Sequence, residues 1–343
     1  MIWSWDEEWN KRAEHLAKNG MYSPENEHDA CGVGFIAAID GKPRRQIVEA
    51  GIEALKSIFH RGAVDADGKT GDGAGINIQI PQEFFREHIK SSGRKMRHEM
   101  LAVGMMFLPK KNFTAQETCR AIVEDEILKL GYQIYGWRQV PVHAEVIGEI
   151  AADSRPEIEQ ILISGKDGID EERFELELYA IRRRIEKAVR AKAINDFYIC
   201  SLSCRSLIYK GLFKAEQLTA FYPDLLDSRF VSSYAIIHQR FSTNTAPAWH
   251  LAQPFRIIAH NGEINTLKGN VNFMRSHEAT FSCDSFKGFE DDIIPVIPDN
   301  TSDTGALDSV FEILTRANRP LPLTKLTLIP PAWSQTSDMP QAH

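Results

Sequence analysis

Cys31 is the residue whose type and position offer the most direct chemistry. It stands where a polar, acidic segment ends and the apolar run CGVGFIAAID begins. Cleavage between Ala30 and Cys31 would place the thiol on the first residue, beside an α-amine whose ordinary pKa is about 7.7–8.0. That amine can deprotonate the thiol without a separate histidine. Cys31 is therefore a candidate nucleophile. The alternative is a small core residue, because free cysteine is among the most buried residue types.

Asn261 and Gly262 are the candidate partners of such a nucleophile. A thiolate that attacks a carboxamide develops negative charge on the carbonyl oxygen, and this charge needs preorganised hydrogen-bond donors. The pair offers a side-chain NH2 group and a backbone N–H that glycine can turn toward a ligand. Asn-Gly is also a common hairpin signal, so a plain turn remains the alternative.

Arg240 and Asp303 are charged residues at the ends of predicted elements. Arg240 follows an apolar strand and can hold a carboxylate through two parallel N–H bonds, or it is a solvated strand-end side chain. Asp303 precedes a helical pattern and can bind the α-ammonium of an amino acid. Capping of that helix is its other role, for which Ser302 and Thr304 are equally suited.

The elements that must position these residues follow from hydrophobic periodicity. Apolar positions at steps of three and four predict an amphipathic helix over 171–194, and a second helix is expected over 46–59. Apolar or alternating runs predict strands at 31–40, 76–80, 101–109, 132–142, 197–211, 233–244 and 255–265, the last two running into polar loops. We expect one α+β domain with strands in meander-like succession.

Three further features have structural interpretations. The glycine-rich loop from Gly62 to Gly75 lacks the residue order of a phosphate-binding loop, so a structural or substrate-lid role is expected. Cys200 and Cys204, four residues apart in a predicted strand, are expected on one face as packed thiols. The histidines near the candidate site show no metal-ligand spacing and are interpreted as structural polar residues.

Composition excludes several classes of function. The 343 residues include 40 basic and 47 acidic side chains, so the chain has no excess of positive charge with which to bind nucleic acid. The longest apolar runs are far below the roughly 18 residues of a membrane span. Residues 1–30 hold seven acids and three bases without an apolar signal region. Five cysteines in such a chain predict reduced thiols and a cytoplasmic protein.

Taken together, the motifs resemble a known family. CGVGF after a short leader, HRGAVDADGKTGDGAGI, FYPDL, RFSTNT, LAQPFRIIAHNGEINTLKGN and SDTGALDSVFEIL are similar to the class II glutamine amidotransferase domain of glutamate synthase large subunits. The likeness runs from about residue 28 to about residue 333, and the block from 238 to 270 is its most specific part.

The resemblance implies a fold, a maturation step and a role for each residue. The family is an amino-terminal-nucleophile hydrolase with a four-layer α/β/β/α sandwich, activated by removal of a leader, here residues 1–30. Cys31 would attack the amide of L-glutamine, and its amine would act as base and then as acid. Asn261 and Gly262 would hold the oxyanion. Arg240 would bind the substrate carboxylate and Asp303 its ammonium, and Arg61 would line the pocket.

The resemblance also implies what lies elsewhere. In the family, ammonia passes to a portion that carries FMN and converts 2-oxoglutarate to glutamate. No cofactor is expected on this chain, and FMN and Fe–S centres are expected only on the remaining synthase portion. The amidotransferase domain, 31–343, is expected to be truncated at its carboxyl end, with a partner domain or subunit completing it. The alternatives are an amidase for another amide and a catalytically silent fragment or binding module.

Overall fold

A computed structural model describes residues 5–20, 23, 32–240, 246–299 and 301–330. The chain divides into two compact units, residues 1–31 and 32–343. In the first, helix α1 (Trp5–Asn19) ends where the Asn19 side chain donates to the carbonyl oxygen of His15 at 3.0 Å. Cys31 lies outside the described residues. The expectation that residues 1–30 form a removable leader stays a prediction.

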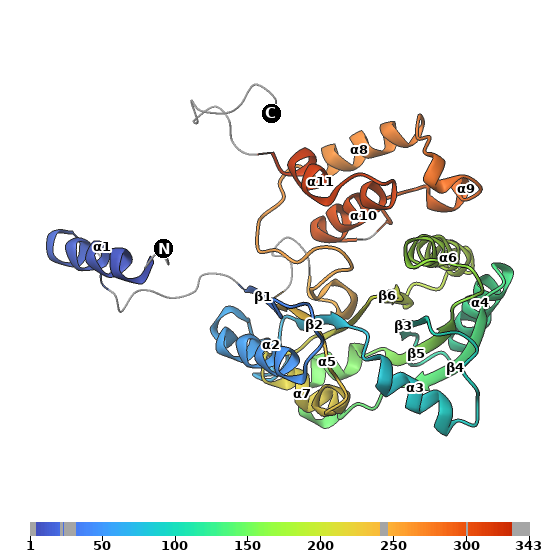
Figure 1. Cartoon of the computed structure of the whole chain (residues 1–343), viewed down its shortest axis with the longest axis horizontal. Coiled ribbons are helices and arrows are strands. Elements are labelled where there is room, and N and C mark those ends of the chain that lie inside the picture. The colour runs from blue at the N-terminus through green and yellow to red at the C-terminus, as the bar shows by residue number, and fades with distance from the viewer. Residues whose placement is uncertain (1–4, 21–22, 24–31, 241–245, 300, 331–343) are drawn as a thin grey trace. The chain divides into compact units, whose positions relative to one another are not determined.

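The second unit is built on two four-stranded antiparallel sheets (Figure 1). The first has the order β1 (Val33–Ala37), β8 (Tyr234–Gln239), β2 (Ala74–Gln79) and β7 (Ser206–Gly211). The second has the order β4 (Gln133–Gln139), β5 (Glu157–Ser164), β3 (Leu101–Leu108) and β6 (Tyr198–Ser203). Every pair of neighbours is antiparallel.

Strand β3 shows why its sequence is apolar throughout. Successive side chains of a strand point to opposite faces. Val103, Met105 and Phe107 belong to the core that the two sheets share with helix α2 (Arg45–Ser57). Ala102, Met106 and Leu108 belong to a second core under helices α4 (Phe113–Lys129) and α6 (Glu171–Ala191). Both faces of the strand are therefore buried, and a continuous apolar run results.

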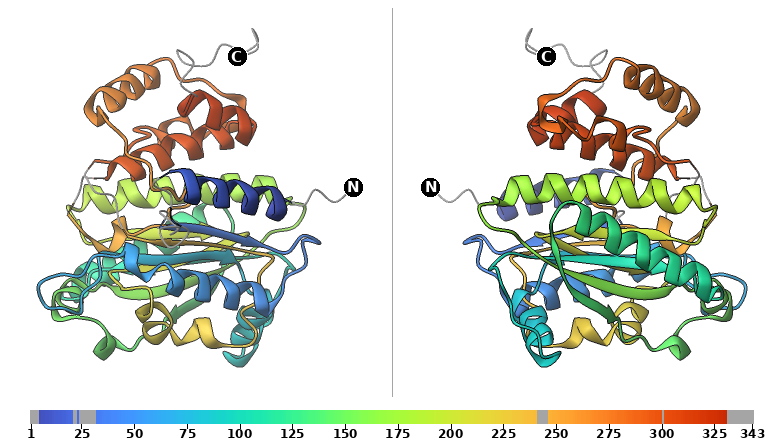
Figure 2. Two further views of the ribbon diagram at one scale, coloured as in Figure 1. Left: turned by 90° about the vertical axis from the view of Figure 1, so that its left-hand side faces the viewer. Right: turned by 90° about the vertical axis from the view of Figure 1, so that its right-hand side faces the viewer.

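Helices cover the sheets. Helix α2 (Arg45–Ser57) packs on the first sheet, where Gly51 lies against Ala235 and Ile237. Helices α4 (Phe113–Lys129) and α6 (Glu171–Ala191) pack on the second sheet. Figure 2 shows the strands between α2 and α6. The predicted amphipathic helix is confirmed, and the five apolar positions from which it was predicted are buried: Phe174, Leu178, Ile181, Ile185 and Val189.

Seven other helices follow β1 in the described ranges. Three of them contribute side chains to the core that contains the two sheets, namely α3 (Gln82–Ser91), α5 (Glu149–Ser154) and α7 (Gln217–Phe221). Four follow the last strand and lie beyond α6 as seen from the sheets (Figure 2): α8 (Leu267–Glu278), α9 (Glu290–Ile293), α10 (Asp303–Arg316) and α11 (Leu321–Leu328). Residues of α8, α9 and α10, with Tyr179 of α6, form a third and smaller core.

The predicted α+β class is confirmed by the helices and the two antiparallel sheets. Three details of the sequence-based prediction were wrong. Residues 255–265 form no strand, because the N–H groups of Ile257 and Ile258 donate to a carboxylate of α10. The strand order is not a meander, since β1 pairs with β8. Cys200 and Cys204 contact different cores, because the register of β3 and β6 shifts at Cys200.

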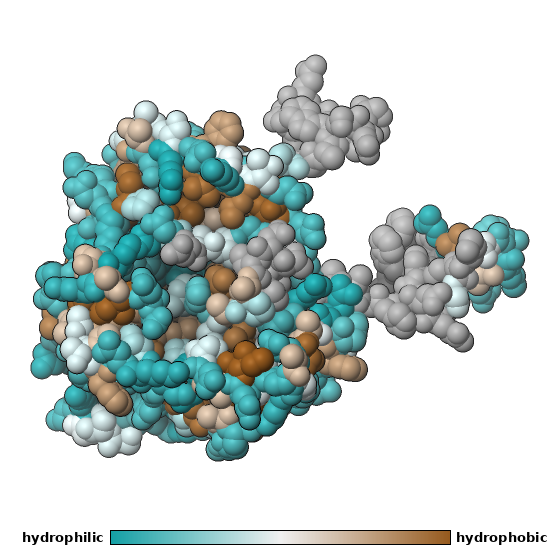
Figure 3. Space-filling view, turned by 180° about the vertical axis from the view of Figure 1, so that it is seen from behind, coloured by the Kyte–Doolittle hydropathy of each residue, from teal (hydrophilic) through white to brown (hydrophobic). Residues whose placement is uncertain are grey.

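One face of the second unit is shown in Figure 3, where hydrophobic residues appear as separate patches among hydrophilic ones. None of the helices in the described ranges is long and apolar enough to cross a membrane.

Candidate active site

The start of β1 and the end of β8 meet at one edge of the first sheet. Val33 is opposite His238, and the N–H of Gln239 donates to the carbonyl oxygen of Gly32 at 2.6 Å. Gly32 directly follows Cys31 in the sequence. A Cβ atom at Gly32 would lie 3.3 Å from Oδ1 of Asn261 and would collide with the carbonyl oxygen of Gln239. Glycine therefore allows the first residues of β1 to approach Asn261 closely.

The loop that carries Asn261 is held by polar side chains. Gln253 accepts from the N–H of His260 and donates to its carbonyl oxygen, both at 3.0 Å. The same carbonyl accepts from Nε2 of His238 at 3.0 Å. Burial lowers the pKa of His238 to about 4, so its ring is neutral near pH 7 and carries its proton on Nε2. Asn261 and Gly262 themselves remain exposed, where a ligand can reach them.

Arg240 follows β8 in a strained backbone conformation. Its φ is +93°, outside the regions that non-glycine residues favour, and its N–H donates to the carbonyl oxygen of Gly73 at 2.7 Å. The side chain is 45% exposed, and Nε lies 3.9 Å from Oδ2 of Asp72. The positive φ belongs to the residue that directly follows β8, and the hydrogen bond to Gly73 holds the backbone there.

Asp72 is a buried carboxylate that the sequence did not single out. It belongs to the glycine-rich loop, is 5% exposed, and within the described part of the chain neither of its oxygens has a hydrogen-bond partner. Burial raises the pKa of Asp72 to about 6, although the charge of Arg240 opposes the shift. The loop thus places beside Arg240 a buried carboxylate whose ionised form lowers the stability of the folded chain.

Substituting Asp72 tests this cost. An unfolded aspartate has a pKa near 3.9. Asp72 in the folded chain binds its proton up to about pH 6, so stability falls as the pH rises from about 4 to about 6. We expect Asp72→Asn to raise the free energy of unfolding by about 1–3 kcal/mol at pH 7.5 and by almost nothing at pH 4. Urea unfolding at both pH values measures this.

The control lies in the same loop. Hydrogen bonds from Thr70 and Lys69 lower the pKa of Asp67, so Asp67→Asn should instead destabilise the chain near neutral pH. An equal gain in the free energy of unfolding for Asp72→Asn at pH 7.5 and pH 4 would contradict the assignment of Asp72 as a buried carboxylate that is ionised near neutral pH.

Asp303 lies at the N-terminus of α10, beside the Asn261 loop. It is buried, and its Oδ1 accepts from the N–H of Thr304 at 2.7 Å. The helix cap is Ser302, whose hydroxyl accepts from the N–H of Gly305 at 3.0 Å. Burial lowers the pKa of His260, whereas the negative charge of Asp303 opposes that shift, so the two residues are electrostatically coupled. Ser302 rather than Asp303 therefore fills the capping role.

The residue that follows Arg61 contacts the end of β8. Arg61 closes a 3-10 turn, Phe59–Arg61, and is partly buried, with a buried Nε that has no hydrogen-bond partner in the described residues. The next residue, Gly62, packs against the side chain of Gln239. Arg61 is thus next to a residue in contact with β8, and its role in a ligand pocket stays a prediction.

Two of the predicted residues, Arg240 and Asn261, lie near Gly32 at the ends of β1 and β8. A third, Asp303, is close enough to His260 for its charge to affect the pKa of that ring. Asp72 and Gln253 were missed, because only burial distinguishes them from ordinary polar loop residues. In the described ranges, no three His, Cys, Asp or Glu side chains gather where they could hold a metal ion.

Known sequences place the chain in a family. A sequence model of class-II glutamine amidotransferases matches residues 31–343. The chain is 59% identical over 336 residues to the glutamate synthase (NADPH) large chain of Azospirillum brasilense, covering 98% of this chain and 22% of that relative. It is 41% identical over 324 residues to the large chain of Bacillus subtilis, covering 93% and 21%.

A third relative is the ferredoxin-dependent glutamate synthase 2 of Synechocystis, 40% identical over 309 residues, covering 90% of this chain and 20% of the relative. The chain spans about a fifth of the length of these curated relatives. The family match covers more than nine-tenths of the 343 residues. The chain therefore belongs to the class-II glutamine amidotransferases.

Proposed function

We propose that this chain hydrolyses the side-chain amide of L-glutamine to glutamate and ammonia, as the amidotransferase part of a glutamate synthase. The observation that carries the proposal is the convergence of Gly32, Asn261 and Arg240 at one sheet edge in a chain of this family. Removal of residues 1–30 makes Cys31 the first residue. Its α-amine then serves as the general base.

The reaction proceeds in two steps. The Cys31 thiolate attacks Cδ of glutamine, and the oxyanion accepts hydrogen bonds from the Asn261 side chain and the Gly262 N–H. The protonated α-amine gives its proton to the departing ammonia, which leaves a thioester. Water, deprotonated by the same amine, hydrolyses the thioester to glutamate and frees the thiol.

Substrate selectivity comes from the groups that bind the two ends of the amino acid. The exposed guanidinium of Arg240 binds the α-carboxylate through paired hydrogen bonds. The buried carboxylate of Asp303 binds the α-ammonium. Arg61 lines the pocket near the nucleophile.

The proposal extends to the fold and to the rest of the synthase. The placement of α2 on one sheet and of α4 and α6 on the other supports a four-layer α/β/β/α sandwich. Ammonia passes to an FMN-binding and central domain or subunit that aminates 2-oxoglutarate. FMN and Fe–S centres belong to that portion, and no residue described above is assigned to them. The free thiols Cys119, Cys200, Cys204 and Cys283 support a cytoplasmic location.

A comparison of amides tests the substrate assignment. Ammonia release is measured for glutamine, asparagine and butyramide with the unsubstituted chain and with Arg240→Ala. Loss of a charge-assisted hydrogen bond costs about 1.5–3 kcal/mol, so we expect KM for glutamine to rise about 10–150-fold in Arg240→Ala. Arg205→Ala is the matched control, because Arg205 is a half-exposed arginine that pairs with Glu171 and Glu172 on α6.

Two outcomes would favour the other candidate functions. Equal turnover of butyramide and glutamine, unchanged in Arg240→Ala, would indicate an amidase for another substrate. Soluble protein that keeps residues 1–30 and does not react with a glutamine-analogue label at Cys31 would indicate a silent binding module.

A further inference from the structure

The segment that leads to Asn261 is anchored to a helix and not to a sheet. Oδ1 of Asp308, in the middle of α10, accepts from the N–H groups of Ile257 at 2.9 Å and Ile258 at 3.1 Å. The Asp308 side chain is fully buried. Phe255 closes the segment locally by donating to the carbonyl oxygen of Ile258 at 3.0 Å. Asp308 therefore replaces the strand neighbour that these N–H groups would otherwise need.

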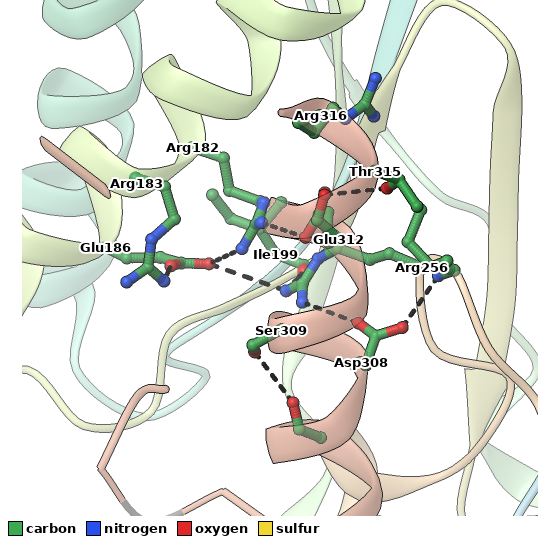
Figure 4. A network of polar contacts seen from close by, with 12 residues as sticks. Arg182, Arg183, Glu186, Ile199, Arg256, Asp308, Ser309, Glu312, Thr315 and Arg316 are labelled. Atoms are coloured by element: carbon green, nitrogen blue, oxygen red, sulfur yellow. Dashed lines mark hydrogen bonds and ion pairs between the residues drawn. The ribbon is translucent and has the colours of Figure 1, made fainter. Parts of the chain in front are cut away.

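Asp308 is itself part of a buried ionic network (Figure 4). Its Oδ2 lies 3.7 Å from Nη1 of Arg256, and Nη2 of Arg256 donates to the carbonyl oxygen of Ile199 in β6 at 2.5 Å. Burial raises the pKa of Asp308, and the positive charge of Arg256 opposes the shift. The network holds three arginines and three carboxylates: Arg182, Arg183, Arg256, Glu186, Asp308 and Glu312.

The position of Asp308 on α10 links two parts of the candidate site. Asp303, the proposed ammonium ligand, is the first residue of this helix, five residues or about 7.5 Å before Asp308. Ile257 and Ile258 lie four and three residues before Asn261, respectively. A single rigid helix thus contacts both the oxyanion loop and the substrate's ammonium site.

We propose that Asp308 is a positioning residue that holds Asn261 at a fixed place relative to Asp303, through its hydrogen bonds to Ile257 and Ile258. This inference rests on the proposed glutaminase function. Asp308 touches no substrate in this account. Its effect is to keep the oxyanion donor where charge develops on an amide whose amino-acid end is bound at α10.

The effect on kinetics differs from that of a general loss of stability. Asn261 acts on charge that exists only in the transition state, whereas Arg240 and Asp303 bind the ground state as well. A displaced loop therefore lowers kcat and leaves KM nearly unchanged. We expect Asp308→Ala to lower kcat about 10–100-fold with KM changed by less than about threefold.

Two variants separate positioning from folding. Asp308→Asn keeps an oxygen that can accept both N–H groups, so it should retain at least about a third of the parent kcat. Glu312→Ala is the matched control, since Glu312 is equally buried on the same helix but pairs with Arg182 at 2.5 Å and not with the loop. We expect it to lower the melting temperature as Asp308→Ala does, and to leave kcat within about threefold.

Kinetics and hydrogen exchange on the full chain test the proposal. The exchange of peptides covering 255–262 should be faster in Asp308→Ala and unchanged in Glu312→Ala and Asp308→Asn. Equal losses of kcat in Asp308→Ala and Glu312→Ala, or a kcat for Asp308→Asn as low as for Asp308→Ala, would overturn it. If Asp308→Ala does not fold, Asp308→Ser, which is too short to hold both N–H groups, replaces it.

Failure of the proposed function has a separate signature. If the unsubstituted chain releases no ammonia from glutamine, that function is wrong, and the exchange comparison alone decides the inference about Asp308. Faster exchange of 255–262 in Asp308→Ala alone then supports the anchor. Equal exchange in both alanine variants overturns it.

Discussion

Cys31→Ser is expected to lower kcat for glutamine hydrolysis by at least about 10³-fold, because an alcohol is far less ionised than a thiol near neutral pH. Coupled detection of released ammonia measures the loss. Burial raises the pKa of Cys119 to about 11 and of Cys200 to about 12, so neither can supply a thiolate in place of Cys31. A glutamine-analogue affinity label should therefore react at Cys31.

Cys283→Ser is the matched control for this substitution. Cys283 is a free thiol that is only partly buried, so its removal reports any general effect of losing an accessible cysteine. It should keep parental turnover. If Cys31→Ser retained turnover within tenfold of the parent, the nucleophile would have to be another group.

Asn261→Ala carries the second large expected effect. Removal of one oxyanion donor typically costs about 10²–10³ in kcat, or about 2.7–4 kcal/mol of transition-state stabilisation. The Asn261 side chain lies beside the start of β1, and its loop is fixed by Gln253 and His238 through His260. We therefore expect the loss in kcat, with KM for glutamine changed only slightly.

The control for Asn261 is another exposed asparagine of the same region. Asn270 lies on α8, where its side chain donates to the carbonyl oxygen of Asn265 at 3.3 Å. Asn270→Ala should leave kcat and KM for glutamine unchanged. A rise in KM without a fall in kcat for Asn261→Ala would assign Asn261 to ground-state binding and contradict its oxyanion role.

The elements that were predictable are those with a repeating pattern. Helix α6 was identified from five apolar positions, and β3 from an unbroken apolar run, because burial imposes these patterns locally. The segment from Phe255 to Ile258 carries the same apolar signal as a strand. Its partner, however, is a carboxylate about 50 residues later, and periodicity carries no information about that.

The residues of the candidate site also fall into those that local sequence predicts and those that it does not. Arg240, Asn261 and Asp303 stood out because each combines a suitable side chain with the end of an element or a turn. Asp72 and Asp308 did not, since both are ordinary acidic residues until the fold buries them. The strain at Arg240 and the close approach at Gly32 also depend on the pairing of β1 with β8. Long-range contacts, and not local sequence, create these features.

The proposal that Cys31 becomes the first residue is tested by intact mass spectrometry of glutamine-hydrolysing protein treated with a glutamine-analogue label. We expect the active species to comprise residues 31–343 and to gain one label, located on Cys31 by peptide mapping. Protein that still begins at Met1 and turns glutamine over at the full rate would contradict it, because the α-amine of Cys31 would then be an amide unable to move a proton.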